Sequence, residues 1–218
     1  MHSQSASHLL LVAMREEAQP LISGLGLVEI ARPDPLRSLY RRGPLLLAVS
    51  GIGAHNMAAM AGLALREHPA IEAVANFGSA GAYAAARLPA GRLRCVEQVA
   101  KWDLQLPLSG MEKHHPPLRL SGGLPAEQGI PACRCNSGCS FSTREARERP
   151  DFPAAELEDM ELYGLASFCS LLGLPLWSLK FVSNQVGDTA LEEFSREFRT
   201  HLHAAADVCC GIAQRWIS

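Results

Sequence analysis

The chain has 218 residues, of which 48% are hydrophobic and 19% are charged, and its formal net charge at pH 7 is −2. This composition favours a globular protein with one sizeable core, and the length favours a single domain over residues 1–218. The small net charge argues against nucleic acid as a partner and favours a small molecule. No apolar run reaches the length of a membrane helix, so we expect a cytoplasmic protein without a membrane partner.

The first hundred residues alternate between strand and helix patterns. The acidic pair Glu16 and Glu17 follows an apolar run directly, which suits the positive end of a helix. Gly43 and Pro44 separate two further apolar runs, as in a hairpin. In chain order, these patterns predict a strand at 9–13, a helix to about residue 22, paired strands at 36–40 and 45–49, a helix at 55–66, and strands at 71–77 and 94–99.

The second half of the chain is less regular. Residues 103–151 are rich in Pro, Gly and Ser and have little periodicity, so no element is predicted there. After this segment, apolar spacing predicts a helix at 158–172, a strand at 176–182 and a last helix at 191–216. Strands that alternate with helices indicate an α/β sandwich.

Four short segments carry the chemistry, and together they resemble a known superfamily. They are Ala13-Met14-Arg15-Glu16-Glu17, Asn76-Phe77-Gly78-Ser79-Ala80-Gly81, Asp159-Met160-Glu161 and Ser183-Asn184. In order and spacing they resemble the nucleoside phosphorylase and nucleosidase superfamily, most closely the methylthioadenosine/S-adenosylhomocysteine nucleosidases. The resemblance implies a three-layer α/β/α sandwich around a central mixed, partly barrel-like sheet. It also implies a homodimer and no cofactor or metal.

The resemblance assigns roles to most of these residues. Glu17 matches the glutamate that activates water, although by residue type alone it would be a solvated acid at a helix start. Glu161 matches the glutamate that accepts hydrogen bonds from the ribose hydroxyls, since a carboxylate offers two acceptor oxygens to a cis-diol. Met160 matches the methionine that packs on the sugar. The remaining substrate-binding positions that the resemblance indicates are Ser79, Ala80, Gly81, Ser183 and Phe141, the last as an aromatic that stacks on the purine.

Asn184 departs from the nucleosidase pattern, because it stands where that branch carries an aspartic general acid. A carboxamide cannot supply a proton, although it can donate an N–H to one base atom and accept from another. The segment Ser183-Asn184 is similar to that of futalosine hydrolases. Asn184 is therefore a candidate catalytic residue that contacts the base, and both adenine and a 6-oxopurine remain open.

These residues predict an enzyme that hydrolyses the N-glycosidic bond of a purine nucleoside. Phosphorylase relatives clamp phosphate with a Gly-Asp-Pro loop and an arginine, where this chain has Glu17 and Asn76. A purine nucleoside phosphorylase and a catalytically degenerate nucleoside-binding protein are the alternatives. Cys133, Cys135 and Cys139 suggest metal only weakly, because no second Cys or His pair lies at zinc-site spacing.

Overall fold

The computed structural model describes residues 6–104, 112–123 and 129–217, and a single mixed sheet runs through its centre. Parallel pairing joins four strands in the order β4 (Leu45–Val49), β1 (His8–Val12), β5 (Ala73–Ala82) and β10 (Leu176–Gln185). The antiparallel strands β3 (Arg37–Arg42) and β2 (Val28–Asp34) extend this sheet beyond β4.

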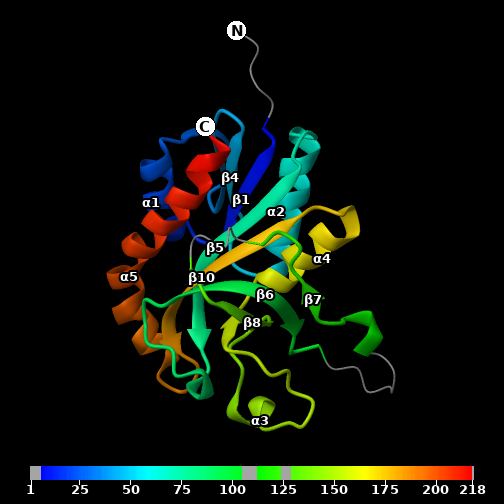
Figure 1. Ribbon diagram of the computed structural model, residues 1–218, viewed down its shortest axis with the longest axis vertical. Coiled ribbons are helices and arrows are strands. Elements are labelled where there is room, and N and C mark those ends of the chain that lie inside the picture. The colour runs from blue at the N-terminus through cyan, green and yellow to red at the C-terminus, as the bar shows by residue number, and fades with distance from the viewer. Residues whose placement is uncertain (1–5, 105–111, 124–128, 218) are drawn as a thin grey trace.

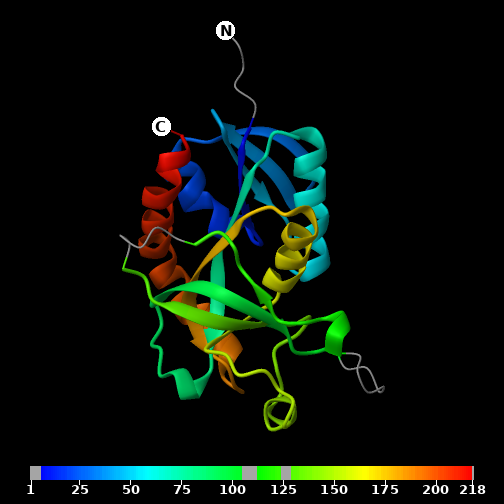
Figure 2. The ribbon, with the colours of Figure 1, turned by 45° about the vertical axis from the view of Figure 1, so that its right-hand side comes forward.

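The other end of the sheet closes on itself. Strand β10 pairs with β6 (Leu93–Lys101), β6 with β8 (Ala132–Ser137), β8 with β9 (Leu157–Asp159), and β9 returns to β5. The short strand β7 (Leu118–Arg119) lies on β6. The sheet is thus open beyond β1 and forms a small barrel where β5 and β10 meet the later strands, seen in the lower half of Figure 2.

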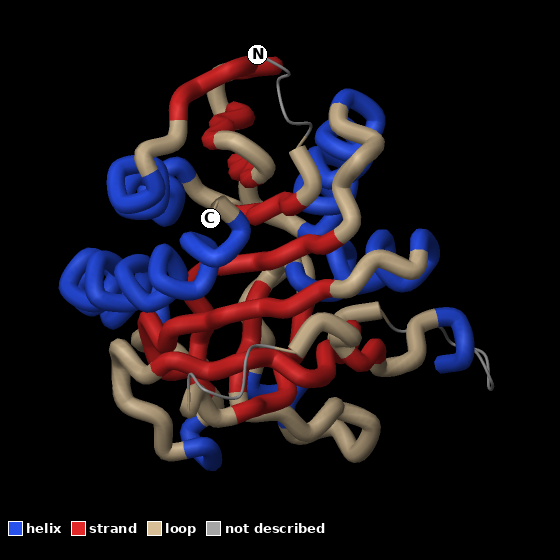
Figure 3. Tube along the Cα trace, turned by 45° about the horizontal axis from the view of Figure 1, so that its top comes forward, coloured by secondary structure: helices blue, strands red, loops and turns tan. Residues whose placement is uncertain are grey.

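Two pairs of helices cover the open part of the sheet. Helices α1 (Arg15–Leu25) and α5 (Ala190–Ala213) lie on one face, and α2 (Ala54–Glu67) and α4 (Leu162–Leu172) on the other (Figures 1 and 3). Each pair encloses its own buried cluster of apolar side chains against the sheet. This arrangement confirms the predicted α/β/α sandwich with a mixed, partly barrel-like sheet. The remaining described helices are short: η1 (Ala84–Ala86), η2 (Glu112–His114), α3 (Arg144–Arg147) and η4 (Gln214–Trp216).

The structure changes two of the predicted boundaries near the motifs. Strand β5 continues beyond its predicted end at residue 77 through Gly78 to Ala82, because these residues pair with the equally long strand β10. The helix predicted from residue 158 begins at Leu162 instead, since residues 157–159 pair as β9 with β5 and β8. Strands β2, β7 and β8 were not predicted.

The described helices can be compared with the length and apolar character of a membrane-spanning helix. None of them is both long enough and apolar enough to cross a bilayer.

Candidate active site

A cavity of about 190 Å³ opens near the carboxyl ends of the parallel strands β1, β5 and β10. Open α/β sheets commonly bind ligands at this edge, because the segments that follow the strands converge there. The cavity collects residues from distant parts of the chain. Its lining includes all nine residues singled out in the sequence: Glu17, Ser79, Ala80, Gly81, Phe141, Met160, Glu161, Ser183 and Asn184.

Glu17 lies in the first turn of α1, and its side chain is only 2% exposed. One carboxylate oxygen accepts from the Ser79 backbone N–H at 2.9 Å and from the Ser79 hydroxyl at 3.0 Å. The other accepts from the Met14 backbone N–H at 3.1 Å. Gly78 allows this approach, since a Cβ there would lie 3.2 Å from Glu17 Oε1. Burial raises the pKa of Glu17, although the Ser79 N–H and the charge of Lys180 oppose the shift.

Glu161 precedes the first residue of α4 and is 8% exposed. Its Oε1 accepts from the Gly53 backbone N–H at 2.8 Å. Gly53 has φ of 106°, a conformation that favours glycine. Burial, with the nearby charge of Asp159, raises the pKa of Glu161 to about 7. This carboxylate therefore changes its charge near neutral pH.

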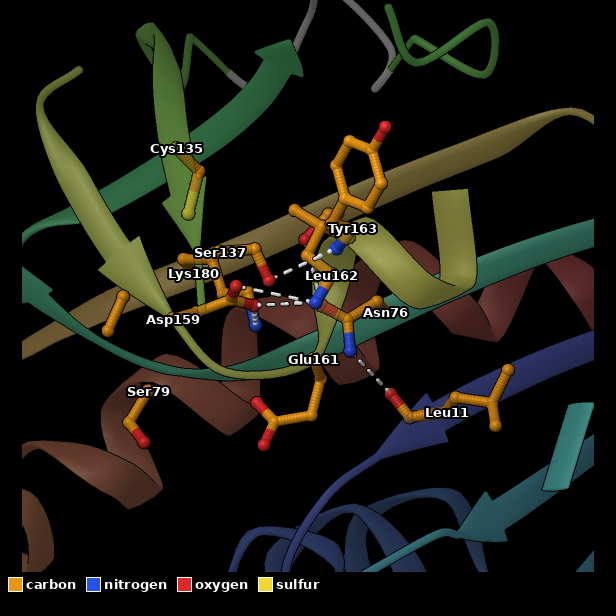
Figure 4. A network of polar contacts seen from close by, with 12 residues as sticks. Leu11, Asn76, Ser79, Cys135, Ser137, Asp159, Glu161, Leu162, Tyr163 and Lys180 are labelled. Atoms are coloured by element: carbon orange, nitrogen blue, oxygen red, sulfur yellow. Dashed lines mark hydrogen bonds and ion pairs between the residues drawn. The ribbon is translucent and has the colours of Figure 1, made fainter. Parts of the chain in front are cut away.

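Asp159 forms an ion pair and helps to cap a helix. Its side chain accepts from the Leu162 N–H, which caps α4, and it pairs with Lys180 at 2.7 Å between Nζ and Oδ2. Figure 4 shows that the Glu161 carboxylate points away from this ion pair, toward the side on which Ser79 lies. Burial disfavours the charged form of Lys180, but the charges of Asp159 and Glu161 raise its pKa overall.

Asn184 is held by its neighbours on β10. The Ser183 hydroxyl donates to Asn184 Oδ1 at 2.8 Å, and Asn184 Nδ2 donates to the Gln185 carbonyl at 2.9 Å. These two contacts orient the amide with its oxygen toward Ser183. The second hydrogen of Nδ2 and the second lone pair of Oδ1 remain for a ligand.

Of the other predicted residues, Ser79 is hydrogen-bonded within the protein, whereas Phe141 is exposed. Ser79 donates its hydroxyl to Glu17, so its side chain supports that carboxylate. Phe141 is 54% exposed at the cavity. Asn76, which stands where phosphorylases carry an arginine, donates to the Leu11 carbonyl at 3.2 Å and accepts from the Ser178 hydroxyl at 2.9 Å.

Two charged residues of the cavity were not singled out in the sequence, namely Lys180 and Glu158. Lys180 is the only charged residue in the apolar run of β10, and such a residue in a buried strand needs a partner. Glu158 and Asp159 lie on strand β9, but the sequence pattern placed both residues in a predicted helix at 158–172. The strand pattern was the signal for Lys180, and no comparable signal existed for Glu158.

The cysteines form no recognisable metal site. Within the described residues, no group of three or more His, Cys, Asp or Glu side chains is arranged to hold a metal ion. None of the seven cysteines, all of which lie in the described ranges, forms a disulfide. Cys133 and Cys135 are buried in β8, whereas Cys139 lies exposed beyond its end.

The chain is similar to known proteins both in its sequence pattern and in its fold. A model of the Phosphorylase superfamily matches residues 7–218. An apo 5′-methylthioadenosine nucleosidase from Arabidopsis thaliana is 21% identical, with a TM-score of 0.81 over 98% of this chain and 95% of its own. A futalosine hydrolase from Helicobacter pylori strain 26695 is 20% identical, with a TM-score of 0.80 over 98% of this chain and 97% of its own.

A third solved structure, the 5′-methylthioadenosine/S-adenosylhomocysteine nucleosidase of Neisseria meningitidis in complex with methylthio-immucillin-A, is 22% identical. Its TM-score is 0.81 over 96% of this chain and 99% of its own. A sequence search of curated proteins found no match. Since the superfamily model spans nearly the whole chain and the fold agrees with these structures, the chain belongs to the Phosphorylase superfamily.

Proposed function

We propose that the protein hydrolyses the N-glycosidic bond of a purine nucleoside to the free base and a ribosyl product. The observation that carries this proposal is the pair of buried carboxylates, Glu17 and Glu161, which line one cavity together with the carboxamide of Asn184. Breaking the bond develops positive charge on the ribose and negative charge on the departing base. Carboxylates near the sugar would stabilise the positive charge, and the N–H of an amide near the base would stabilise the negative charge.

Glu17 is the proposed general base that activates water. A base works best when its pKa lies near the operating pH, and burial raises the pKa of Glu17 in that direction. The two N–H groups and the hydroxyl that it accepts from fix the direction of its remaining lone pair. Water positioned there would lose a proton to the carboxylate while it attacks the sugar.

Glu161 and Met160 are the proposed ribose-binding residues. The Gly53 N–H holds one oxygen of Glu161, so the carboxylate keeps acceptor capacity for the sugar hydroxyls. Ala80 and Gly81 line the cavity, and Phe141 is available there to stack on the base. The Ser183 hydroxyl holds the amide of Asn184, which would contact the base. In this assignment Asn184 stabilises the departing base by hydrogen bonding and does not protonate it.

Phosphorolysis is the main alternative, and the charges around the cavity disfavour it. A phosphate at the position of the attacking water would meet the buried carboxylate of Glu17. Asn76 supplies no positive charge, and Lys180 is already paired with Asp159. Nucleoside binding without turnover is the second alternative, because the carboxamide of Asn184 cannot supply a proton to the departing base.

A nucleoside panel tests the proposal. Inosine, futalosine, methylthioadenosine and adenosylhomocysteine would be incubated with the protein, and free base would be measured with and without phosphate. We expect base release that is independent of phosphate. Release that requires phosphate would replace hydrolysis by phosphorolysis, and binding without any release would leave a nucleoside-binding protein.

A further inference from the structure

A second groove lies outside the candidate active site, between η1, the start of β6 and the segment that precedes β8. Its volume of about 680 Å³ falls within the usual range for small-molecule sites, and it shares no lining residue with the cavity at Glu17. Three of its lining residues are arginines, Arg87, Arg92 and Arg94, and none of its described lining residues is acidic. The groove is therefore positively charged, although the chain as a whole has a net charge of −2.

The three arginines have no carboxylate partner. None of them forms an ion pair within the part of the chain that the structure describes, whereas Arg134 on the neighbouring strand β8 pairs with a carboxylate. Arg87 and Arg92 are exposed, and Arg94 is half-buried with its Nη1 donating to the Leu93 carbonyl at 2.8 Å. The guanidinium groups thus keep most of their N–H donors for a ligand.

The sheet fixes the backbone that carries two of these arginines. The Arg92 carbonyl accepts from the Val182 N–H at 3.0 Å, and the Gly91 N–H donates to the Val182 carbonyl at 2.8 Å. Arg94 pairs with Lys180 in the antiparallel register of β6 and β10, which lie side by side in Figure 1. Residues two apart on an extended backbone are roughly 7 Å apart and project to the same side. Arg92 and Arg94 are therefore presented together, without backbone that must first be ordered.

Arg87 stands in an unusual backbone conformation. Its φ is 52°, and among the described residues it is the only one with positive φ that is not a glycine. It follows η1, and its N–H donates to the Ala84 carbonyl at 3.2 Å. The left-handed region is unfavourable for a residue with a Cβ, and residues held in it are concentrated at binding sites. At this position, the conformation brings a third guanidinium to the groove.

We propose that this groove binds a small molecule that carries two or more phosphate groups. A guanidinium matches phosphate oxygens with paired N–H donors, and three guanidiniums without carboxylates suit a ligand with several negative charges close together. Leu88, Leu93 and Ile130 add an apolar wall that can contact an organic body attached to the phosphates. Inorganic pyrophosphate and a nucleoside triphosphate share this chemistry and differ in that body. The inference does not depend on the proposed hydrolase activity.

Arginines that are merely solvated make a different prediction. They would attract any anion weakly, in proportion to charge, and any arginine on the surface would contribute alike. Arg66 on α2 is the matched control, because it is exposed, carries the same charge and lies outside the groove. Citrate is the matched control ligand, since it carries several negative charges on carboxylates in place of phosphates.

The test measures binding of inorganic pyrophosphate, ATP and citrate by titration calorimetry, without divalent cations and at about 0.15 M ionic strength, where weak surface attraction is screened. We expect pyrophosphate and ATP to bind, and citrate to bind about tenfold more weakly or less. Arg87→Gly and Arg92→Ala should each weaken phosphate binding by about tenfold or more, and Arg66→Ala by less than about twofold. Tighter binding of ATP than of pyrophosphate would assign an organic phosphate, and equal binding an inorganic one.

Thermal unfolding of Arg87→Gly separates binding from folding. Glycine adopts the left-handed conformation readily, so the variant should not have a lower Tm although it loses a guanidinium. Weakened binding at an undiminished Tm would assign the loss to the side chain. The inference would be overturned if neither phosphate compound bound, if Arg87→Gly and Arg92→Ala left binding unchanged, if Arg66→Ala weakened binding equally, or if citrate bound as tightly.

Discussion

At the scale of single residues, Glu17 is buried and accepts hydrogen bonds from three donors. A substitution that keeps its shape should therefore lower turnover without lowering the affinity for the nucleoside. Glu17→Gln keeps the shape and most hydrogen bonds but cannot accept the proton of water. We expect turnover to fall below detection while nucleoside affinity stays within about tenfold. Single-turnover kinetics and equilibrium binding measure the two effects. Unchanged turnover would remove Glu17 from the mechanism.

Glu161 makes stability depend on pH in a defined direction. Its pKa rises from an ordinary value of 4.5 to about 7 on folding, so between these values the folded protein binds more protons than the unfolded chain. Its contribution to stability is therefore greatest below pH 4.5 and is lost as the pH rises toward 7. Denaturant unfolding of the native protein and of Glu161→Gln across this window measures the difference. We expect the stability gap between them to change by a few kcal/mol, and a constant gap would contradict the shift.

Asn184 decides how the base leaves. In Asn184→Asp, a carboxylate would repel the O6 of a 6-oxopurine unless it were protonated, while an adenine nucleoside would gain a proton donor at N7. We expect kcat/KM for inosine to fall and that for methylthioadenosine to rise, the rise by ~10²-fold or more. Steady-state kinetics on both substrates check this, with Asn184→Ala as the control that should weaken both reactions. A parallel loss in both variants would show that Asn184 only maintains structure.

At the scale of elements, helices α2 and α4 meet through a close contact at Gly164. A Cβ on Gly164 would lie 2.4 Å from the carbonyl oxygen of Ala54, which is backbone and cannot move away cheaply. Gly164→Ala should therefore lower the free energy of unfolding by about 1–3 kcal/mol. Gly211 in α5 is the matched control, since nothing lies within 4 Å of its Cβ position.

The control substitution should change the free energy of unfolding in the opposite direction. Gly211→Ala should stabilise the protein by about 0.5–1 kcal/mol, because alanine restricts the unfolded chain and favours the helix. Urea unfolding of both variants measures the pair. Equal effects would show that α2 and α4 can separate without cost at this contact.

At the scale of the whole molecule, the cavity has an apolar rim that a second copy of the chain could cover. Ile52 is 51% exposed and Leu191 is 67% exposed, and both line the cavity with Phe141. Exposed apolar groups around a binding site are typical of an interaction surface. We predict a homodimer in sedimentation equilibrium, and Leu191→Glu should shift it toward monomer. A monomer at all concentrations would leave the rim open to the nucleoside alone.

Local sequence determined the strands β1, β3, β4, β5, β6 and β10, the four main helices and the membership of the superfamily. Apolar periodicity identifies α1 and α5, and the short motifs around Glu17 and Glu161 can be read without knowing their partners. Tertiary structure alone decided how the barrel closes, because β8 and β9 have only six and three residues and pair with distant strands. The same long-range pairing joins Lys180 to Asp159 and sets Glu158 across Gly81 from Asn184. Such neighbours depend on register between strands, which periodicity within one segment does not specify.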